Sequence, residues 1–112
     1  MDAPVDLTNL RSMTDGDKDL EKELFKEFYS AFDAGLNLLQ VSTGDGAVET
    51  WRGQSHALKG VALNLGAEKL GALCKKAQES QTASEKAKVA MLENIRAEYK
   101  WVKEFLLKTS EG

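Results

Sequence analysis

Proline is almost absent from this chain, and this absence constrains the fold more than any other feature. The 112 residues contain one proline, Pro4, which precedes the first periodic segment. Because proline interrupts helices, the rest of the chain can form long, uninterrupted ones. Apolar residues recur three or four positions apart, as is typical of helices with one buried face. No alternating strand pattern occurs, so the sequence predicts an all-α protein.

Turn residues divide the chain into five expected helices. A short helix is expected at about 6–13, and Asp17 is a good N-cap for the next one. Gly66 suits the left-handed end of a helix, and Thr82–Glu85 resembles a capping box. The longer helices are expected at about 18–41, 47–65, 67–81 and from the capping box to 108. Short connections between them predict an antiparallel four-helix bundle with the short first helix as an addition, in one domain spanning 1–112 with its core at about 6–108.

The apolar positions of each expected helix form its predicted core face. Trp101 is expected in the core or at its edge, and Cys74 is expected inside. The longer helices contribute, in order, Leu20, Leu24, Phe28, Ala31, Phe32, Leu36 and Leu39; Trp51, Ser55, Leu58, Ala62 and Leu65; Leu70, Leu73, Cys74 and Ala77; and Leu92, Ile95, Tyr99, Val102 and Leu106.

Charge and composition exclude several classes of function. The net charge is −3, whereas nucleic-acid binding needs a surplus of clustered Lys and Arg. The chain starts with an acidic segment instead of a secretory signal, and no stretch approaches the ~20 apolar residues that span a bilayer. A single cysteine, Cys74, excludes an internal disulfide and a thiolate zinc site. We expect a cytoplasmic protein that binds no metal, cofactor, nucleic acid or membrane.

The only histidine, His56, lies in the middle of the third expected helix. At about 100° per residue, it points roughly 140° away from the centre of that helix's core face, toward solvent. Neutral imidazole is a nucleophile near neutral pH, so His56 is the candidate reactive group. Its neighbours on the same surface are Arg52, Gly53, Lys59, Gly60 and Leu63.

The two glycines beside His56 are unusual inside a helix, because each costs about 0.5–1 kcal/mol relative to alanine. Gly53 and Gly60 therefore indicate that space is kept clear beside the imidazole, although close helix packing is an alternative. Lys59 places a cation one turn from His56, where a transferred phosphoryl group would carry negative charge. Leu63 is a candidate docking contact or is partly covered by another helix.

The residues around His56 resemble the signature of histidine-containing phosphotransfer domains. The segment SHALKG from Ser55 to Gly60, followed by LNLG from Leu63 to Gly66, matches the pattern His-x-Leu-Lys-Gly with a later Asn-x-Gly. The surrounding chain agrees over nearly its whole length. The resemblance implies an antiparallel four-helix bundle that accepts a phosphoryl group from the aspartate of a receiver domain and passes it on.

By position, the resemblance implies that His56 is the phosphorylated residue. It also implies that Lys59 stabilises the phosphoryl group and that Gly60 keeps the site open. Related domains carry a Gln or Glu about where Gln78 stands, twenty-two residues after His56. A shift of one residue would choose Glu79 instead, and Gln78 would then be a plain surface residue.

Partners should recognise this surface through charge. Lys75 and Lys76 form a basic pair near the predicted site, which either attracts the acidic pocket of a receiver domain or is simply a solvated face. No nucleotide-binding loop and no catalytic Ser or Cys arrangement is visible, so no enzymatic turnover of its own is expected. The expected partners are receiver domains and a histidine kinase. The chain is expected to be a monomer, either free-standing or part of a larger hybrid kinase. The alternative function is a helical adaptor that binds and inhibits a receiver domain or kinase without carrying phosphate.

Overall fold

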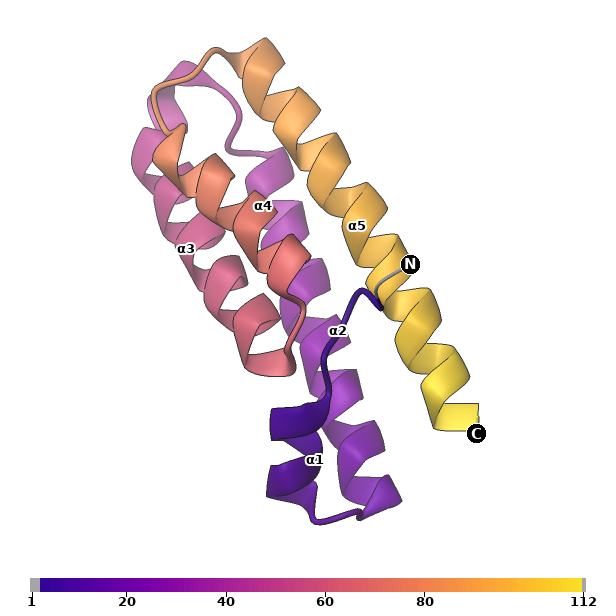
Figure 1. The fold of residues 1–112 in the computed structure, drawn as a ribbon. Coiled ribbons are helices and arrows are strands. Elements are labelled where there is room, and N and C mark those ends of the chain that lie inside the picture. The colour runs from indigo at the N-terminus through magenta and orange to yellow at the C-terminus, as the bar shows by residue number, and fades with distance from the viewer. Residues whose placement is uncertain (1–2, 112) are drawn as a thin grey trace.

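The computed structural model describes residues 3–111, with the side chains of residues 3–109, and is all-helical (Figure 1). No strand occurs in this range, which confirms the predicted all-α class. The predicted helix ends differ from those observed by a few residues, as local end effects allow. The elements are α1 (Thr8–Thr14), α2 (Lys18–Gln40), the short 3-10 helix η1 (Asp45–Ala47), α3 (Val48–Leu65), α4 (Glu68–Glu79) and α5 (Glu85–Glu111).

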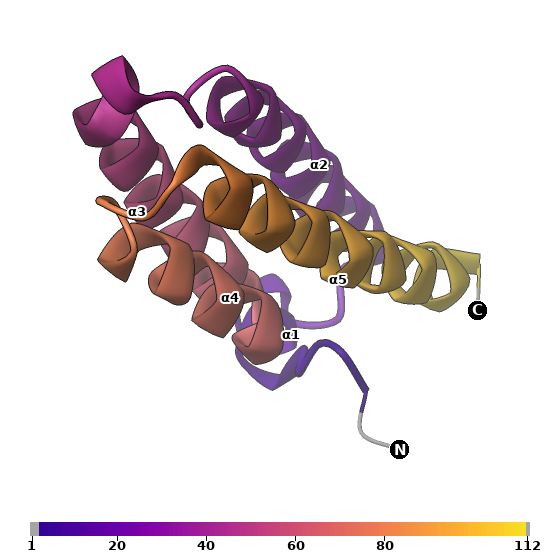
Figure 2. The same ribbon diagram turned by 90° about the horizontal axis from the view of Figure 1, so that it is seen from above.

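The four longer helices lie side by side, and α1 packs against α2 (Figures 1 and 2). Helix α3 contacts both α2 and α4, and α5 contacts both α4 and α2. Each long helix therefore buries its apolar face against two neighbours. The helices thereby enclose one hydrophobic core.

Two helix ends follow the sequence prediction, and one does not. The Asp17 carboxylate accepts hydrogen bonds from the backbone N–H groups of Asp19 and Leu20, which confirms the N-cap of α2. Gly66 ends α3 with a left-handed φ of 100°, as predicted. The predicted capping box with Thr82 is wrong. Helix α5 begins at Glu85, so Ser84 is the N-cap and its hydroxyl accepts a bond from Ala87 N–H.

The buried face of α2 is rotated from the one predicted. Leu20 is 39% exposed and Ala31 is exposed, so their assignment to the core is wrong. Phe25, which was not assigned to the core, is 2% exposed. The reason is that the face is set by contact with both α3 and α5 rather than by one neighbour. The residues that line it are Glu21, Phe25, Phe28, Phe32, Gly35, Leu36 and Leu39.

The core faces of α3, α4 and α5 agree with the prediction except at their edges. All five predicted residues of α3, including Trp51 and Ser55, are buried, and so is Cys74 on α4. Leu73 is only half-buried. Trp101 lies at the edge of the core, with 37% of its surface exposed.

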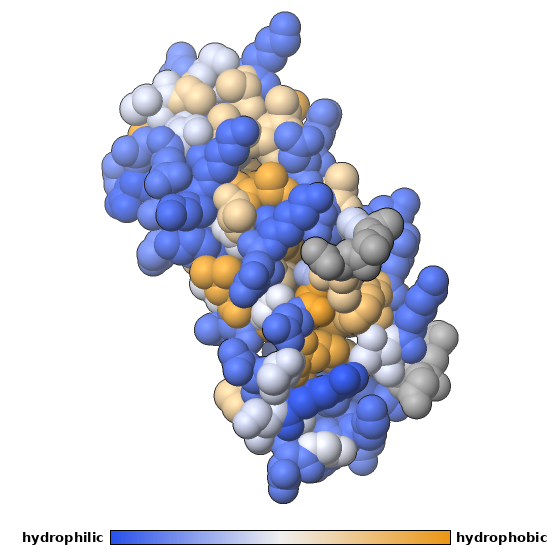
Figure 3. All heavy atoms as spheres, in the orientation of Figure 1, coloured by the Kyte–Doolittle hydropathy of each residue, from blue (hydrophilic) through white to orange (hydrophobic). Residues whose placement is uncertain are grey.

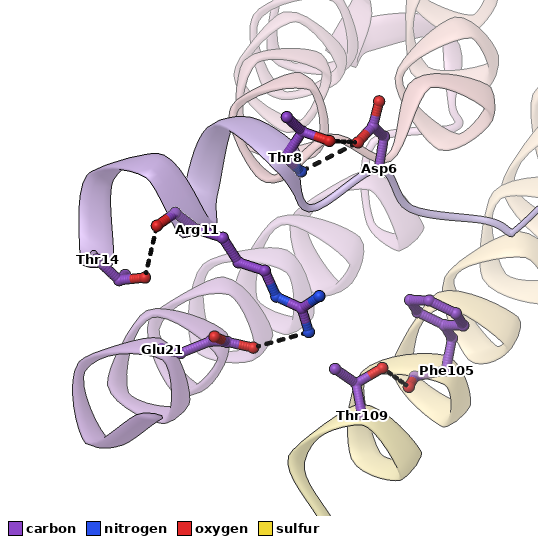
Figure 4. Close-up of polar contacts among 7 residues, drawn as sticks. All are labelled: Asp6, Thr8, Arg11, Thr14, Glu21, Phe105 and Thr109. Atoms are coloured by element: carbon purple, nitrogen blue, oxygen red, sulfur yellow. Dashed lines mark hydrogen bonds and ion pairs between the residues drawn. The ribbon is translucent and has the colours of Figure 1, made fainter. Parts of the chain in front are cut away.

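The segment before α1 packs against the turn between α3 and α4 (Figure 1). Val5 and Leu7 are buried, and the backbone N–H of Asp6 donates to the carbonyl of Gly66 at 2.9 Å. Figure 4 shows Arg11 of α1 reaching the Glu21 carboxylate of α2, with nitrogen and oxygen 3.5 Å apart. The segment and α1 are thus fixed both to the α3–α4 turn and to α2.

The surface seen in Figure 3 is mostly hydrophilic, with apolar residues gathered along the middle of the view. Among the described residues, no helix combines the length and the apolar character needed to cross a membrane.

Candidate functional site

His56 lies on the outer surface of α3. Its side chain is exposed, whereas Ser55 and Leu58 on either side are buried. This is the direction expected from the helical spacing, because the core-facing residues fix the rotation of α3. The imidazole can therefore be reached by another molecule.

Gln78 of α4 lies beside the imidazole. Its Oε1 atom is 3.4 Å from Nδ1 of His56, a long hydrogen-bonding contact. Gln78 is half-buried, whereas Glu79 is exposed. Because Oε1 is an acceptor, the contact favours the tautomer in which Nδ1 carries the proton and Nε2 has the free lone pair. The structure thus brings Gln78, rather than Glu79, to the histidine.

The surface around His56 is open at both glycines. Apart from the backbone of its own helix turn and its two chain neighbours, a methyl group added to Gly53 or Gly60 would meet no atom within 4 Å. Close helix packing therefore does not explain either glycine. Both leave bare backbone on the same face of α3 as the imidazole, one on each side along the helix.

Lys59 follows His56 by three residues on α3, and Lys75 and Lys76 lie on α4. Within the described range, none of Lys59, Lys75 or Lys76 takes part in an ion pair. Lys59 is half-buried, and the other two are exposed. Arg52 pairs with Glu49 at 3.0 Å, but both side chains are largely exposed, so this pair is weak. The lysine ammonium groups are thus available to an approaching anion.

Leu63 lies at the seam between α3 and α4. It is 48% exposed, while its Cδ2 atom fills the space over Gly71, where an added methyl carbon would be 2.6 Å away. Leu63 is thus partly covered by another helix, α4, as one interpretation of the sequence expected. Its other part faces solvent, so it also remains a candidate docking contact.

Other groups that could react lie elsewhere or are buried. Burial raises the pKa of the Cys74 thiol to about 12, which keeps it protonated and inert near neutral pH. Among residues 3–111, no group of three or more His, Cys, Asp or Glu side chains could hold a metal ion. His56 therefore remains the candidate reactive group, exposed between two glycines that have open space beside them.

Sequence reasoning placed Trp51 in the core but missed its polar contact. The indole Nε1–H donates to the carbonyl of Ala77 at 2.7 Å. Buried Trp side chains usually donate to such an acceptor, and this tendency was the only sequence signal for the bond. Also missed was Lys88 of α5, which is 1% exposed and places its Nζ atom 5.4 Å from the centre of the Trp51 ring.

Taken together, the site consists of one exposed imidazole, a side-chain amide in contact with it and bare backbone on both sides, with Lys59 one turn along α3. Such a surface can accept an anionic group from a partner that supplies the rest of the chemistry. Comparison with protein-family models, with curated proteins and with solved structures found no match for this chain.

Proposed function

We propose that this protein is a phosphorelay intermediate that carries a phosphoryl group on His56. The observation that carries the proposal is the contact between Gln78 Oε1 and His56 Nδ1 at 3.4 Å, on a ring that is otherwise open to solvent. The contact leaves the nucleophilic lone pair on Nε2, the ring nitrogen farther from the backbone. A phosphoryl donor can approach that atom directly.

In the proposed transfer, Nε2 attacks the phosphorus of an aspartyl phosphate on a receiver domain. The N–P bond forms as the bond between phosphorus and the aspartate oxygen breaks, and the aspartate leaves as a carboxylate. The ring becomes positively charged during the attack. Gln78 Oε1, facing Nδ1–H, stabilises that charge. The reverse reaction loads a second receiver domain.

Positively charged side chains and open backbone near His56 also promote the proposed transfer. Phosphoryl transfer depends mainly on positioning and on stabilisation of negative charge. Lys59, one turn from His56, neutralises the phosphoryl oxygens, and Lys75 and Lys76 attract the acidic pocket of the receiver. Gly53 and Gly60 allow close approach. The receiver also contacts Arg52 and the exposed part of Leu63.

The proposal also covers the type of fold, the partners and the location of the protein. We infer that the four long helices are the antiparallel bundle of a histidine-containing phosphotransfer domain, with α1 as an addition. The donor and its metal belong to the partner, so the protein acts as a carrier without kinase activity of its own. Its partners are receiver domains and a histidine kinase, and it acts as a monomer in the cytoplasm.

Incubation with receiver domains labelled with radioactive phosphate on aspartate tests the proposal. We expect a label on this chain that is stable in base, labile in acid and lost in His56→Gln. Gln78→Ala should slow the transfer by about tenfold, equivalent to about 1.4 kcal/mol. Gln54→Ala is the matched control, because Gln54 is a half-buried glutamine on α3, and it should transfer normally. Tight binding of receivers without any label would overturn the proposal and favour the inhibitory adaptor.

A further inference from the structure

A buried hydrogen bond joins α3 to α4 one residue before Gln78. The Trp51 indole N–H on α3 donates to the Ala77 carbonyl on α4 at 2.7 Å. Both residues are 0% exposed, so water does not compete for the bond. The Ala77 carbonyl belongs to the peptide group that leads directly into Gln78. Its position therefore fixes where the Gln78 side chain starts.

Gln78 needs such a tether because it lies at the end of a short helix. Helix α4 ends at Glu79, so Gln78 is its penultimate residue. Terminal turns of helices fray, because their last carbonyls lack partners within the helix. Ser80 supplies two local bonds, from its N–H to Ala77 and from its hydroxyl to Lys76. These bonds hold the turn together but do not place it relative to His56.

The Trp51 ring is itself held from a third helix. Lys88 of α5 places its Nζ atom 5.4 Å from the ring centre, within the range of a cation–π contact. Lys88 is 1% exposed, so its ammonium group is held near the ring in a largely dry environment. The indole thus has a fixed orientation toward Ala77, set by α5 as well as by α3.

We propose that Trp51 is a positioning residue for phosphoryl transfer, which acts by keeping Gln78 Oε1 within reach of His56 Nδ1. This inference rests on the proposed function of His56 and names a residue that does not touch the reacting atoms. Loss of the indole N–H lets the last turn of α4 move, so that the imidazole loses its preferred tautomer. The fraction of rings with a free lone pair on Nε2 then falls.

Trp51→Phe is the appropriate variant. It removes the N–H group but keeps an aromatic ring under Lys88, and Ala77 keeps its bond from the Ser80 N–H. Trp101→Phe is the matched control, because Trp101 lies at the edge of the core on α5. Nitrogen-15 NMR of His56 reports the tautomer ratio in the unphosphorylated protein, and phosphorylation by phosphoramidate reports the rate.

We expect Trp51→Phe to lower the Nδ1–H tautomer fraction and to slow phosphorylation about threefold to tenfold, as for the loss of one hydrogen bond. Trp101→Phe should change neither. Gln78→Ala should have the same effect as Trp51→Phe, and the double variant should be no slower than Gln78→Ala alone, because both changes remove one contact.

A Trp51→Phe variant that melts earlier but keeps the tautomer ratio and the rate of the original protein would overturn the inference. So would a double variant whose rate loss is the product of the two single losses. If Trp51→Phe does not fold, Lys88→Met decides, because Lys88 holds the indole from α5. It should lower the Nδ1–H tautomer fraction of His56, and an unchanged fraction would count against the tether.

The two proposals fail in different ways. The tautomer ratio is measured without any phosphoryl donor. If His56 is never labelled by a receiver or by phosphoramidate, the proposed function fails, while the tautomer ratio still shows whether Trp51 positions Gln78.

Discussion

Replacing both glycines beside His56 with alanine should make the protein more stable and less active. Neither Gly53→Ala nor Gly60→Ala introduces a tertiary contact, since each added methyl group has no atom within 4 Å beyond its own helix turn. Glycine inside a helix costs about 0.5–1 kcal/mol relative to alanine, so the double variant should gain about 1–2 kcal/mol. With an unfolding entropy of about 2.1 cal/mol/K for each of 112 residues, the melting temperature should rise by about 4–8 °C.

Gly35→Ala is the matched control, because Gly35 is also a glycine within a helix. There an added methyl carbon would overlap the Leu58 side chain, with Cγ only 2.8 Å away. Leu58 is 2% exposed, so its side chain is enclosed by the core. Overpacking of this kind costs about 1–3 kcal/mol, which exceeds the gain in helix propensity. The same substitution should therefore lower the melting temperature at Gly35 and raise it at Gly53 and Gly60.

Thermal unfolding followed by circular dichroism and phosphoryl transfer from a labelled receiver measure the two effects. The stabilised double variant should transfer about tenfold more slowly if the methyl groups weaken the encounter by about 1.4 kcal/mol. A melting temperature that stays the same or falls would refute the reasoning about open space. A higher melting temperature with unchanged transfer would refute the idea that the glycines serve access to His56.

Three further predictions concern the core. The Cys74 thiol, whose pKa is raised to about 12 by burial, should react with Ellman's reagent at pH 8 only after urea is added, and rapid reaction without urea would contradict its burial. Burial, together with the hydrogen bond to Asp33, raises the pKa of Tyr99 above 10.0. The protonated phenol therefore stabilises the fold below about pH 10, and this stabilisation is lost as the pH rises further. The urea midpoint should therefore fall above pH 10, and less so in Tyr99→Phe; an equal fall in both would argue against this source. Arg11→Ala should cost about 1–3 kcal/mol because the Glu21 carboxylate, 5% exposed, loses its partner, and an unchanged urea midpoint would show that the pair contributes nothing.

The errors in the sequence prediction lie where two local signals compete. Leu20 and Ala31 continue the apolar spacing of α2 as well as Phe25 does, yet only Phe25 is buried. Spacing identifies a stripe, but the side of the stripe that is buried depends on where the neighbouring helices lie. Likewise, Thr82 and Ser84 are both good N-caps, and the structure starts α5 after Ser84.

The amino-acid sequence alone determined the approximate extent of the α-helices, the left-handed end at Gly66 and the outward direction of His56. These features depend on residues within one or two turns of each other, so neighbouring side chains encode them. The contact between His56 and Gln78 and the bond from Trp51 to Ala77 join residues 22 and 26 positions apart. Such contacts depend on the rotation and axial position of α4 against α3, which follow only when all the helices pack together, as Leu58 against Gly35 and Leu63 over Gly71 show.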